Sequence, residues 1–478
     1  MAGSLILDAL ARPRSRAFFQ MRSVAGIWLL WVLTSVPLAL FLAISGNLPV
    51  SAGLALALVG LFTMVSNAKR AMLGEALVFS DLALLGAVFR HPQFYFSALT
   101  KGQKALLALA CPIVPGLLWR VFVHDLYAHL SGLALLAAGL LLLRLAIRMP
   151  PWSRLAPVPD AEADVVRHGL IATVFLHWQR WRASDDPVPI NAEIGRVPEP
   201  DELAIVIQCE SFADPVALFG DSSLALPALE AARTCAWASG ALGVSGFGAY
   251  TMRTEYGVLF GRSDEDLGFR RFDPFLTAAR EASFALPQRL KSSGWRSLFV
   301  HPHDMRFYSR DTIMAAGGFS ELIGEACFAP PAVDEGRYVT DAAIAAKILA
   351  LAESATVPTL IYAVTIENHG PWKASSQGES LRSGYLRLLS KGDAMLETLH
   401  SAFKAMQRPV TLVFFGDHRP SIPGISDPTG ARDTPYVMLR FDRNGHAIST
   451  TTQPQDITPA GLHHLILNAL DTGWSKGL

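Results

Sequence analysis

Long apolar runs in the first 150 residues constrain the fold of this chain more than any other feature of its sequence. The first run, Val24–Ile44, contains two tryptophans and is long enough to cross a bilayer as a helix. Three more runs follow it, at Val50–Val65, Ala105–Val121 and Leu126–Leu143. No small-residue cleavage site follows the first run, so we predict an anchor and not a signal peptide. Residues 1–150 are therefore expected to form a multi-span transmembrane domain.

The number of spans is predicted as four or five, because a shorter run at Ala76–Phe89 carries Asp81. Four spans would return the rest of the chain to the side of the N-terminus, and five would place it on the other side. Positive charge before the first run predicts a cytoplasmic N-terminus. The residues concerned are Arg12, Arg14, Arg16 and Arg22. Arg144 and Arg148 after the last run favour a cytoplasmic end there too.

Composition narrows the classes of function. Hydrophobic residues make up 51% of the 478 and charged residues 17%, with a mean hydropathy of +0.31, and the apolar excess precedes residue 150. The formal net charge is +0, so nothing suggests a nucleic-acid partner. Four cysteines are too few for a disulfide framework. Cys111 is expected in the membrane, and Cys209, Cys235 and Cys327 are either buried thiols or include one oxidised pair.

Residues 151–200 differ in character from both of their neighbours. Between Asp160 and Arg182, apolar residues recur at helical spacing with basic residues among them. This pattern is typical of an amphipathic helix on a membrane surface, and a helix packed on a soluble domain is the alternative. Residues 183–200 are rich in Pro, Asp and Glu, which predicts a linker.

From residue 201 to 478, short β-branched runs alternate with longer helical patterns. The predicted strands are Leu203–Gln208, Ser297–Val300, Thr359–Thr365, Val410–Phe415 and Tyr436–Phe441. The predicted helices include Leu381–Met406 and Pro459–Leu470. Such alternation predicts an α/β domain with a mixed, mostly parallel sheet and helices on both faces.

Polar residues stand where these predicted strands end. Glu210 follows the first strand, His301 the second, His369 the third, and Asp417 with His418 the fourth. Ligands gather beyond the carboxyl ends of the strands in such sheets. We therefore expect these side chains to lie close together at one edge.

Two carboxylates and an imidazole, from Glu210, Asp417 and His418, form a donor set suited to one divalent ion. We expect Mn²⁺, with Mg²⁺ or Zn²⁺ as alternatives. Asp417 and His418 are adjacent, so both reach one ion only if the chain turns there. Thr251 follows a glycine-spaced turn and opens a helical pattern, so it is a candidate fourth ligand and nucleophile. Taken alone, Thr251 would more simply be a helix N-cap.

A second group has the chemistry of a phosphate pocket. Arg310 can bind a phosphate through two parallel hydrogen bonds, and Tyr308 can contact a small polar head group. His301 and His369 can neutralise phosphoryl oxygens or pass a proton to a leaving oxygen. Arg419 is either a phosphate clamp or the partner of a local ion pair.

Together these motifs resemble lipoteichoic acid synthase and related phosphoglycerol transferases of the alkaline phosphatase/sulfatase superfamily. Five motifs occur in the family's order. They are Cys209-Glu210-Ser211, Thr251 four residues before Glu255 and Tyr256, His301 with Phe307-Tyr308-Ser309-Arg310-Asp311, Asn368-His369-Gly370-Pro371, and Gly416-Asp417-His418. The resemblance implies metal ligands at Glu210, Thr251, Asp417 and His418. It also implies a catalytic domain outside the cytoplasm, attached to the bacterial inner membrane.

By this resemblance, Thr251 takes phosphoglycerol from phosphatidylglycerol, releases diacylglycerol and passes the group to an acceptor, which we expect to be a periplasmic glucan or another glycan. Tyr308 and Ser309 replace a tryptophan and an asparagine of the family, so the head group remains open. A phosphoethanolamine transferase acting on lipid A or a glycan is the first alternative, and a non-catalytic sensor of lipid head groups is the second. The sulfatase Cys-x-Pro-x-Arg signature is absent, which disfavours hydrolysis of sulfate esters.

Overall fold

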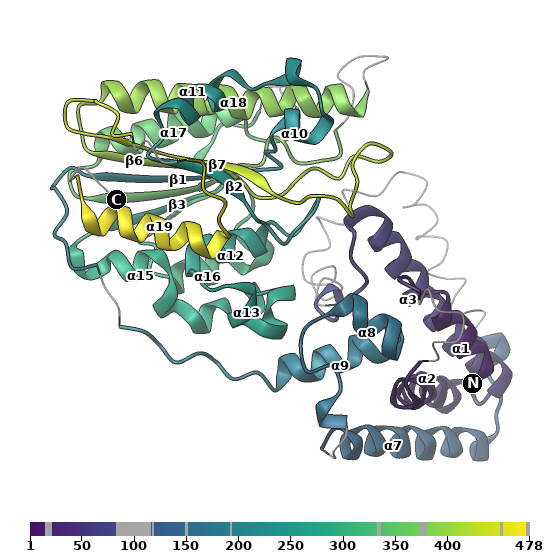
Figure 1. Cartoon of the computed structure of the whole chain (residues 1–478). Helices are drawn as coiled ribbons and strands as arrows, with labels where there is room; N and C mark the ends of the chain where they lie inside the picture. Colours follow the sequence, from purple (N-terminus) through teal and green to yellow (C-terminus); the bar gives the residue numbers. More distant parts are fainter. Residues whose placement is uncertain are drawn as a thin grey trace. The chain divides into compact units, whose positions relative to one another are not determined.

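The computed structural model describes residues 1–14, 22–82, 116, 119–148, 152–191, 194–331, 336–372, 380–449 and 453–474. The chain divides into two compact units, Met1–Ser184 and Asp185–Leu478 (Figure 1). The first unit is helical, and the second combines a sheet with helices.

Among the described residues of the first unit, three helices are long and apolar enough to cross a membrane. They are α2 (Val24–Ser45), α3 (Leu48–Leu73) and α7 (Leu126–Arg148). These helices confirm three of the four predicted long runs. The predicted run at Ala105–Val121 and the second half of Ala76–Phe89 fall largely outside the described residues. A short helix that was not predicted, α1 (Ala2–Ala9), packs along α3.

Helices α2 and α7 pack closely and in opposite directions. A Cβ atom added to Gly132, near the start of α7, would lie 2.4 Å from the backbone nitrogen of Ala43, near the end of α2. Further along α7, a Cβ added to Gly139 would meet Val36 Cγ2 at 3.2 Å. Small residues that let two backbones approach are typical of helix pairs in membranes. The start of α2 and the end of α7 therefore lie at the same end of this pair.

A hydrogen bond adds to the description of this end of the helix pair. The backbone N–H of Ser23, just before α2, donates to the Arg167 carbonyl at 2.8 Å. Arg167 belongs to α8 (Ala161–His168), which follows α7. Arg22 and the segment leading to the second unit thus lie at one end of the helix pair. The number of spans and the side of the membrane that each unit faces remain predictions.

The single amphipathic helix predicted over Asp160–Arg182 is two helices, α8 and α9 (Leu170–Arg182). They break at Gly169, where φ is 92° and an added Cβ would lie 2.5 Å from Asp8 Oδ2. The apolar face of α9 joins a buried cluster with α2 and α7. Its buried members from the three helices are Leu29, Val32, Leu143, Ala172 and Leu176. The placement of α8 and α9 on a membrane surface remains a prediction.

The second unit contains a seven-stranded sheet in the order β2-β7-β6-β1-β5-β3-β4. The strands are β1 (Leu203–Cys209), β2 (Ala238–Leu242), β3 (Arg296–Val300), β4 (Glu321–Ile323), β5 (Thr359–Val364), β6 (Val410–Gly416) and β7 (Thr434–Phe441). All five predicted strands are present. The two missed strands lie at the edges, where β2 is made of small residues and β4 has only three residues.

Helices cover both faces of this sheet (Figure 1). On one face lie α11 (Pro227–Cys235), α17 (Asp341–Ser354) and α18 (Leu381–Ala405), and on the other lie α12 (Thr251–Phe260) and α19 (Pro459–Thr472). Every residue of β1, β5 and β6 is buried, as expected for strands packed on both faces. The predicted fold class is confirmed.

Strands β6, β1, β5 and β3 run parallel to one another, and among the described strands antiparallel pairing involves β7 with β6 and β2. The carboxyl ends of four neighbouring parallel strands therefore meet at one edge of the sheet. This edge carries the polar residues that the sequence singled out.

Candidate metal centre

The chain turns out of the sheet directly after β6. A Cβ atom added to Gly416, the last residue of the strand, would lie 1.8 Å from the Phe212 carbonyl oxygen, so only glycine fits there. Asp417 and His418 follow outside the strand, with Asp417 Oδ2 3.4 Å from His418 Nε2. The predicted turn is present, and it brings both side chains to one point.

Glu210 directly follows the adjacent strand β1, and its carboxylate accepts a hydrogen bond from its neighbour Ser211. The Ser211 backbone, at φ 50°, donates its N–H to Asp417 Oδ1 at 2.7 Å. The Ser211 hydroxyl donates to Glu210 Oε1 at 2.8 Å. Ser211 therefore links both carboxylates, a role that we did not predict. Its position directly after Glu210 was the only available signal.

Glu210, Asp417 and His418 each offer one ligand atom, and these atoms lie within 4.8 Å of one another. All three side chains are buried. Asp417 Oδ2 has no hydrogen-bond partner among the described residues. His418 donates from Nδ1 to the Arg419 carbonyl at 3.1 Å, which turns the Nε2 lone pair toward the carboxylates. This donor set fits one divalent cation.

The electrostatics of the cluster agree with that fit. Burial, and then the charge of Glu210, raise the pKa of Asp417 to about 6. Burial opposes the charged form of His418, but Asp417 and Glu210 outweigh it and raise its pKa. Two buried carboxylates destabilise each other unless a positive charge lies between them. A bound cation would remove this penalty.

Thr251 lies at the start of α12, beside the cluster. Its Oγ1 atom is 3.4 Å from His418 Nε2. The preceding residue, Tyr250, occupies the N-cap position at φ 69°, so Thr251 is the first helical residue and not the cap. One turn later, the Thr254 hydroxyl donates to the Asp417 carbonyl at 2.7 Å. This bond fixes the start of α12 against the end of β6.

The turn before Thr251 also needs a glycine. Gly248 has φ 63°, and a Cβ added there would lie 2.2 Å from Ser421 Cβ. Its backbone N–H donates to the Arg419 carbonyl at 2.8 Å. The turn is thereby held against the segment that carries the metal ligands.

Arg310, predicted to bind phosphate, is buried and paired with Glu255. Its Nε and Nη2 atoms donate to the two carboxylate oxygens of Glu255 at 3.0 and 2.6 Å. Glu255 lies four residues after Thr251 on α12, so the pair lies one helical turn from the candidate nucleophile. We did not predict this role for Glu255. A phosphate at Arg310 would meet a guanidinium whose charge is already balanced.

His301, predicted to act on the phosphoryl group, lies at the end of β3 and faces Arg310. Its Nδ1 donates to the Val364 carbonyl at 3.0 Å, and its Nε2 lies 3.5 Å from Arg310 Nη1. Burial, and then Arg310, hold the pKa of His301 well below its usual value. The ring is therefore neutral at pH 7, so it does not add positive charge to the pocket in this arrangement.

Tyr308 lies in a strained segment. Tyr308 and Ser309 have φ values of 59° and 55°, uncommon for residues with side chains. The Tyr308 ring lies 5.3 Å from the Arg310 guanidinium carbon and 6.3 Å from the Phe275 ring centroid. Burial raises the pKa of Tyr308. The segment thus holds an aromatic ring against the buried ion pair.

The remaining predicted residues lie further out. His369 is exposed, with Nδ1 donating to the Gly370 carbonyl at 2.7 Å, and its neighbour Asn368 donates to the Ser211 carbonyl at 3.4 Å. Arg419 donates to the carbonyl and carboxylate of Asp433 at 2.7 and 2.9 Å. Of the two predicted roles of Arg419, the structure shows the ion pair, and a phosphate contact remains a prediction.

The described cysteines, Cys209, Cys235 and Cys327, are all free thiols. Cys111 lies outside the described residues. The sequence left open whether two of these cysteines form a disulfide, and in the structure all three are unpaired.

Comparison with known proteins places this site in a family. Residues 202–466 match the family model described as Sulfatase. A capsular polysaccharide biosynthesis protein of Rhizobium meliloti, RkpI, is 30% identical over 431 residues, covering 84% of this chain and 79% of that protein. A second Rhizobium meliloti protein, named for cyclic beta-1,2-glucan modification, is 24% identical over 198 residues, covering 38% of this chain and 31% of the relative.

Among solved structures, the lipooligosaccharide phosphoethanolamine transferase EptA of Neisseria meningitidis, an integral membrane protein, covers 98% of this chain. The match covers 95% of that structure at a TM-score of 0.54 and 12% identity, which shows a shared fold. The family model spans more than half of the chain, and the motifs lie within it. The chain is therefore a membrane protein that belongs to the sulfatase family of the alkaline phosphatase/sulfatase superfamily, a superfamily of metal-dependent enzymes.

Proposed function

We propose that the protein transfers phosphoglycerol from phosphatidylglycerol to a glycan acceptor through a covalent intermediate on Thr251. One observation carries this proposal. The Thr251 hydroxyl lies 3.4 Å from His418 Nε2, in the ligand set completed by Glu210 and Asp417. A serine or threonine hydroxyl is a weak nucleophile at neutral pH and needs such activation.

The proposed chemistry has two balanced steps. In the first, Thr251 Oγ1 forms a bond to phosphorus and loses its proton, while the bond from phosphorus to the diacylglycerol oxygen breaks and that oxygen gains a proton. In the second, an acceptor hydroxyl loses its proton and its oxygen bonds to phosphorus, while the bond from phosphorus to Thr251 Oγ1 breaks and that oxygen regains a proton. A divalent cation bound by Glu210, Asp417 and His418, with Thr251 as fourth ligand, would lower the pKa of the threonine hydroxyl.

The chain's own groups would orient the phosphoryl group. The amides at the start of α12 are suited to phosphate oxygens, because helix N-termini carry unsatisfied N–H donors. Arg310 Nη1 faces His301, on the side of the guanidinium away from Glu255. We propose that phosphate approaches this side, with the exposed His369 at the rim as proton donor to the leaving oxygen.

The names of the relatives support a glycan acceptor. One belongs to capsular polysaccharide biosynthesis and one to cyclic beta-1,2-glucan modification. Three helices long enough to cross a membrane support a lipid donor. We propose that the protein resides in a bacterial inner membrane with its second unit facing the periplasm.

Phosphoethanolamine transfer is the second candidate function. The fold similarity to the Neisseria meningitidis phosphoethanolamine transferase over nearly the whole chain favours it. The ligand set and Thr251 would serve either head group equally. We rank phosphoglycerol first because the ordered motifs resemble phosphoglycerol transferases.

The two candidates separate in one experiment on the full chain in lipid nanodiscs with Mn²⁺. Phosphatidylglycerol and phosphatidylethanolamine with labelled acyl chains are supplied separately, and release of labelled diacylglycerol is followed. We expect release from phosphatidylglycerol only. Mass spectrometry of the trapped Thr251 peptide then names the transferred group. Release from phosphatidylethanolamine alone would establish the second candidate, and no release from either lipid would refute both.

A further inference from the structure

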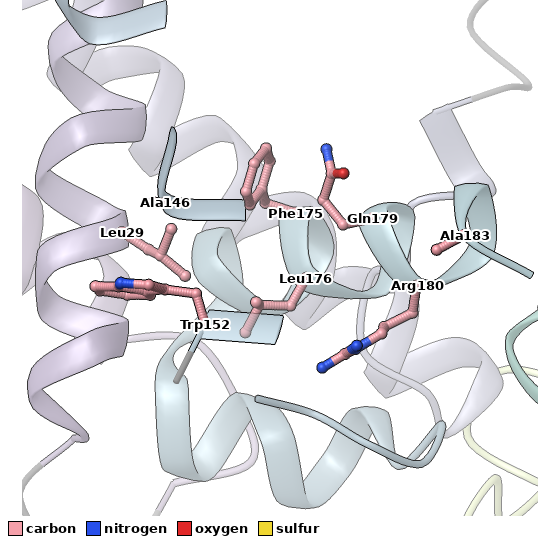
Figure 2. A pocket seen from close by; sticks show the side chains of 8 residues that line it. All are labelled: Leu29, Ala146, Trp152, Phe175, Leu176, Gln179, Arg180 and Ala183. Carbon is pink, nitrogen blue, oxygen red and sulfur yellow. The ribbon is translucent and has the colours of Figure 1, made fainter. Parts of the chain in front are cut away.

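A small cavity of about 180 Å³ lies in the first unit and shares no residue with the candidate metal centre. Its lining comes from α2, α7, the turn at Trp152 and one side of α9. The residues are Leu29, Ala146, Trp152, Phe175, Leu176, Gln179, Arg180 and Ala183 (Figure 2). Nothing in the proposed reaction uses this cavity.

The cavity lies at one end of the apolar helices. Leu29 is in the second turn of α2, and Ala146 is two residues before the end of α7 at Arg148. Trp152 follows α7, and its ring lies 4.5 Å from the ring of Trp28. Tryptophan gathers at the boundary between the hydrocarbon and water, and arginine marks the end of a span. These residues predict that the cavity lies at the level of a membrane boundary.

Its two sides differ in chemistry. Leu29 and Trp152 lie on one side and Arg180 and Ala183 on the other (Figure 2). Arg180 donates from Nε and Nη2 to the Leu155 carbonyl at 3.1 and 2.6 Å, which fixes its guanidinium beside the cavity. The last turn of α9 also carries Arg182, which is not part of the lining and lies over the Trp178 ring. The cavity thus combines a mainly apolar lining with one arginine, Arg180.

We propose that this cavity binds the first part of one acyl chain of an anionic glycerophospholipid, with the lipid phosphate toward Arg180. Cavities of about 150 Å³ hold a molecule such as benzene, so this one accommodates about six chain carbons. A membrane lipid brings an apolar chain and a negative phosphate to the same depth as the apolar lining and the arginine. The lipid would hold α9, which leads into the second unit, at the membrane boundary. Binding does not require that this lipid be the donor of the reaction.

Photolabelling of the full chain in phosphatidylcholine nanodiscs tests the proposal. The probe is phosphatidylglycerol with a diazirine within about the first six carbons of one acyl chain, and labelled peptides are mapped by mass spectrometry. We expect adducts on the peptide that contains Phe175 and Leu176. Ala146→Phe and Ala183→Phe fill the cavity from opposite sides and should lower this labelling at least about tenfold, since each buried methylene is worth roughly fourfold in binding.

The matched control is Leu145→Phe, which places the same ring on an exposed position of α7. It should leave labelling of α9 unchanged. Equal labelling in all variants, or an equal loss in the control, would overturn the proposal. If Ala146→Phe is not monodisperse, Ala183→Phe decides the outcome. A phosphatidylcholine probe should label more weakly, and equal labelling by both head groups would refute the role of Arg180. All readouts are independent of catalytic activity.

Discussion

The candidate site has two sides that differ in how buried charge is balanced. The ligand side consists of Glu210, Asp417 and His418, and the proposed phosphate side consists of Arg310 and Glu255. On the ligand side, Glu210 and Asp417 are buried next to each other with only a histidine between them. On the phosphate side, Arg310 already has a bidentate carboxylate partner in Glu255. The first arrangement sets two carboxylates against one imidazole, and the second pairs one guanidinium with one carboxylate. We infer that a cation would balance the ligand side, whereas on the proposed phosphate side Glu255 already balances Arg310.

Removing the nucleophile should have the largest effect. Thr251→Ala deletes the proposed attacking oxygen and should lower turnover by at least about 10⁴-fold. Diacylglycerol release from labelled lipid measures it. Thr251→Ser keeps a hydroxyl on the same helical turn and should retain part of the activity. Activity of the alanine variant within tenfold of the parent would remove Thr251 from its role.

Changing the ligand side should come next. Asp417→Asn removes one charge of the carboxylate pair and should reduce turnover on the order of 10³-fold, because metal stabilisation is worth several kcal/mol. Calorimetric titration with Mn²⁺ should show weakened binding, while the metal-free protein should lose no thermal stability. Asp427→Asn, on an exposed residue of the following loop, is the control. Unaltered Mn²⁺ affinity in Asp417→Asn would contradict the cation site.

Substitutions on the proposed phosphate side should change both the stability of the protein and the KM for the lipid donor. Glu255→Gln leaves the Arg310 guanidinium buried without its carboxylate and should cost about 3 kcal/mol in the free energy of unfolding. Arg310→Ala should raise the KM for the lipid, and a double-mutant cycle with Glu255→Gln should show strong coupling. Glu265→Gln, on an exposed residue just after α12, is the matched control. Additive effects of the two changes would show that the ion pair is not an energetic unit.

Asp341 is a third buried carboxylate with which to compare the two sides, and we expect changing it to have a smaller effect. Asp341, in the first turn of α17, is fully buried, and its backbone N–H donates to Glu367 Oε2 at 2.7 Å. Burial, and then Glu367, raise the pKa of Asp341 to about 8. A carboxyl pKa that is higher in the folded state means that stability falls as pH rises from about 4 toward 8.

Asp341→Asn should remove this part of the pH dependence. At pH 8 the variant should be more stable than the parent by at least about 2 kcal/mol, and near pH 4 the two should be similar. Denaturant unfolding at both pH values measures the difference. Glu353→Gln, on an exposed residue of the same helix, should shift neither value. Equal pH profiles for parent and Asp341→Asn would show that Asp341 is ionised in the folded protein.

The second unit followed its sequence pattern closely where strands are buried on both faces. β1, β5 and β6 read as continuous apolar runs, since both faces of each strand are covered. The edge strands were not predicted. β2, Ala238–Leu242, consists mainly of small residues and is a strand because it pairs with β7. β-propensity depends on neighbours more than on the strand itself, so such edges are hard to predict.

The sequence by itself determined the apolar helices, the parallel strands and the polar residues at their carboxyl ends, because these depend on local periodicity and on the order of elements. Only the tertiary structure decided the roles of Ser211 and Glu255, and the pairing of Arg419 with Asp433. It alone also showed that α2 begins where α7 ends. Such partners are far apart in the chain, and hydrogen bonds between them leave no periodic trace in the sequence.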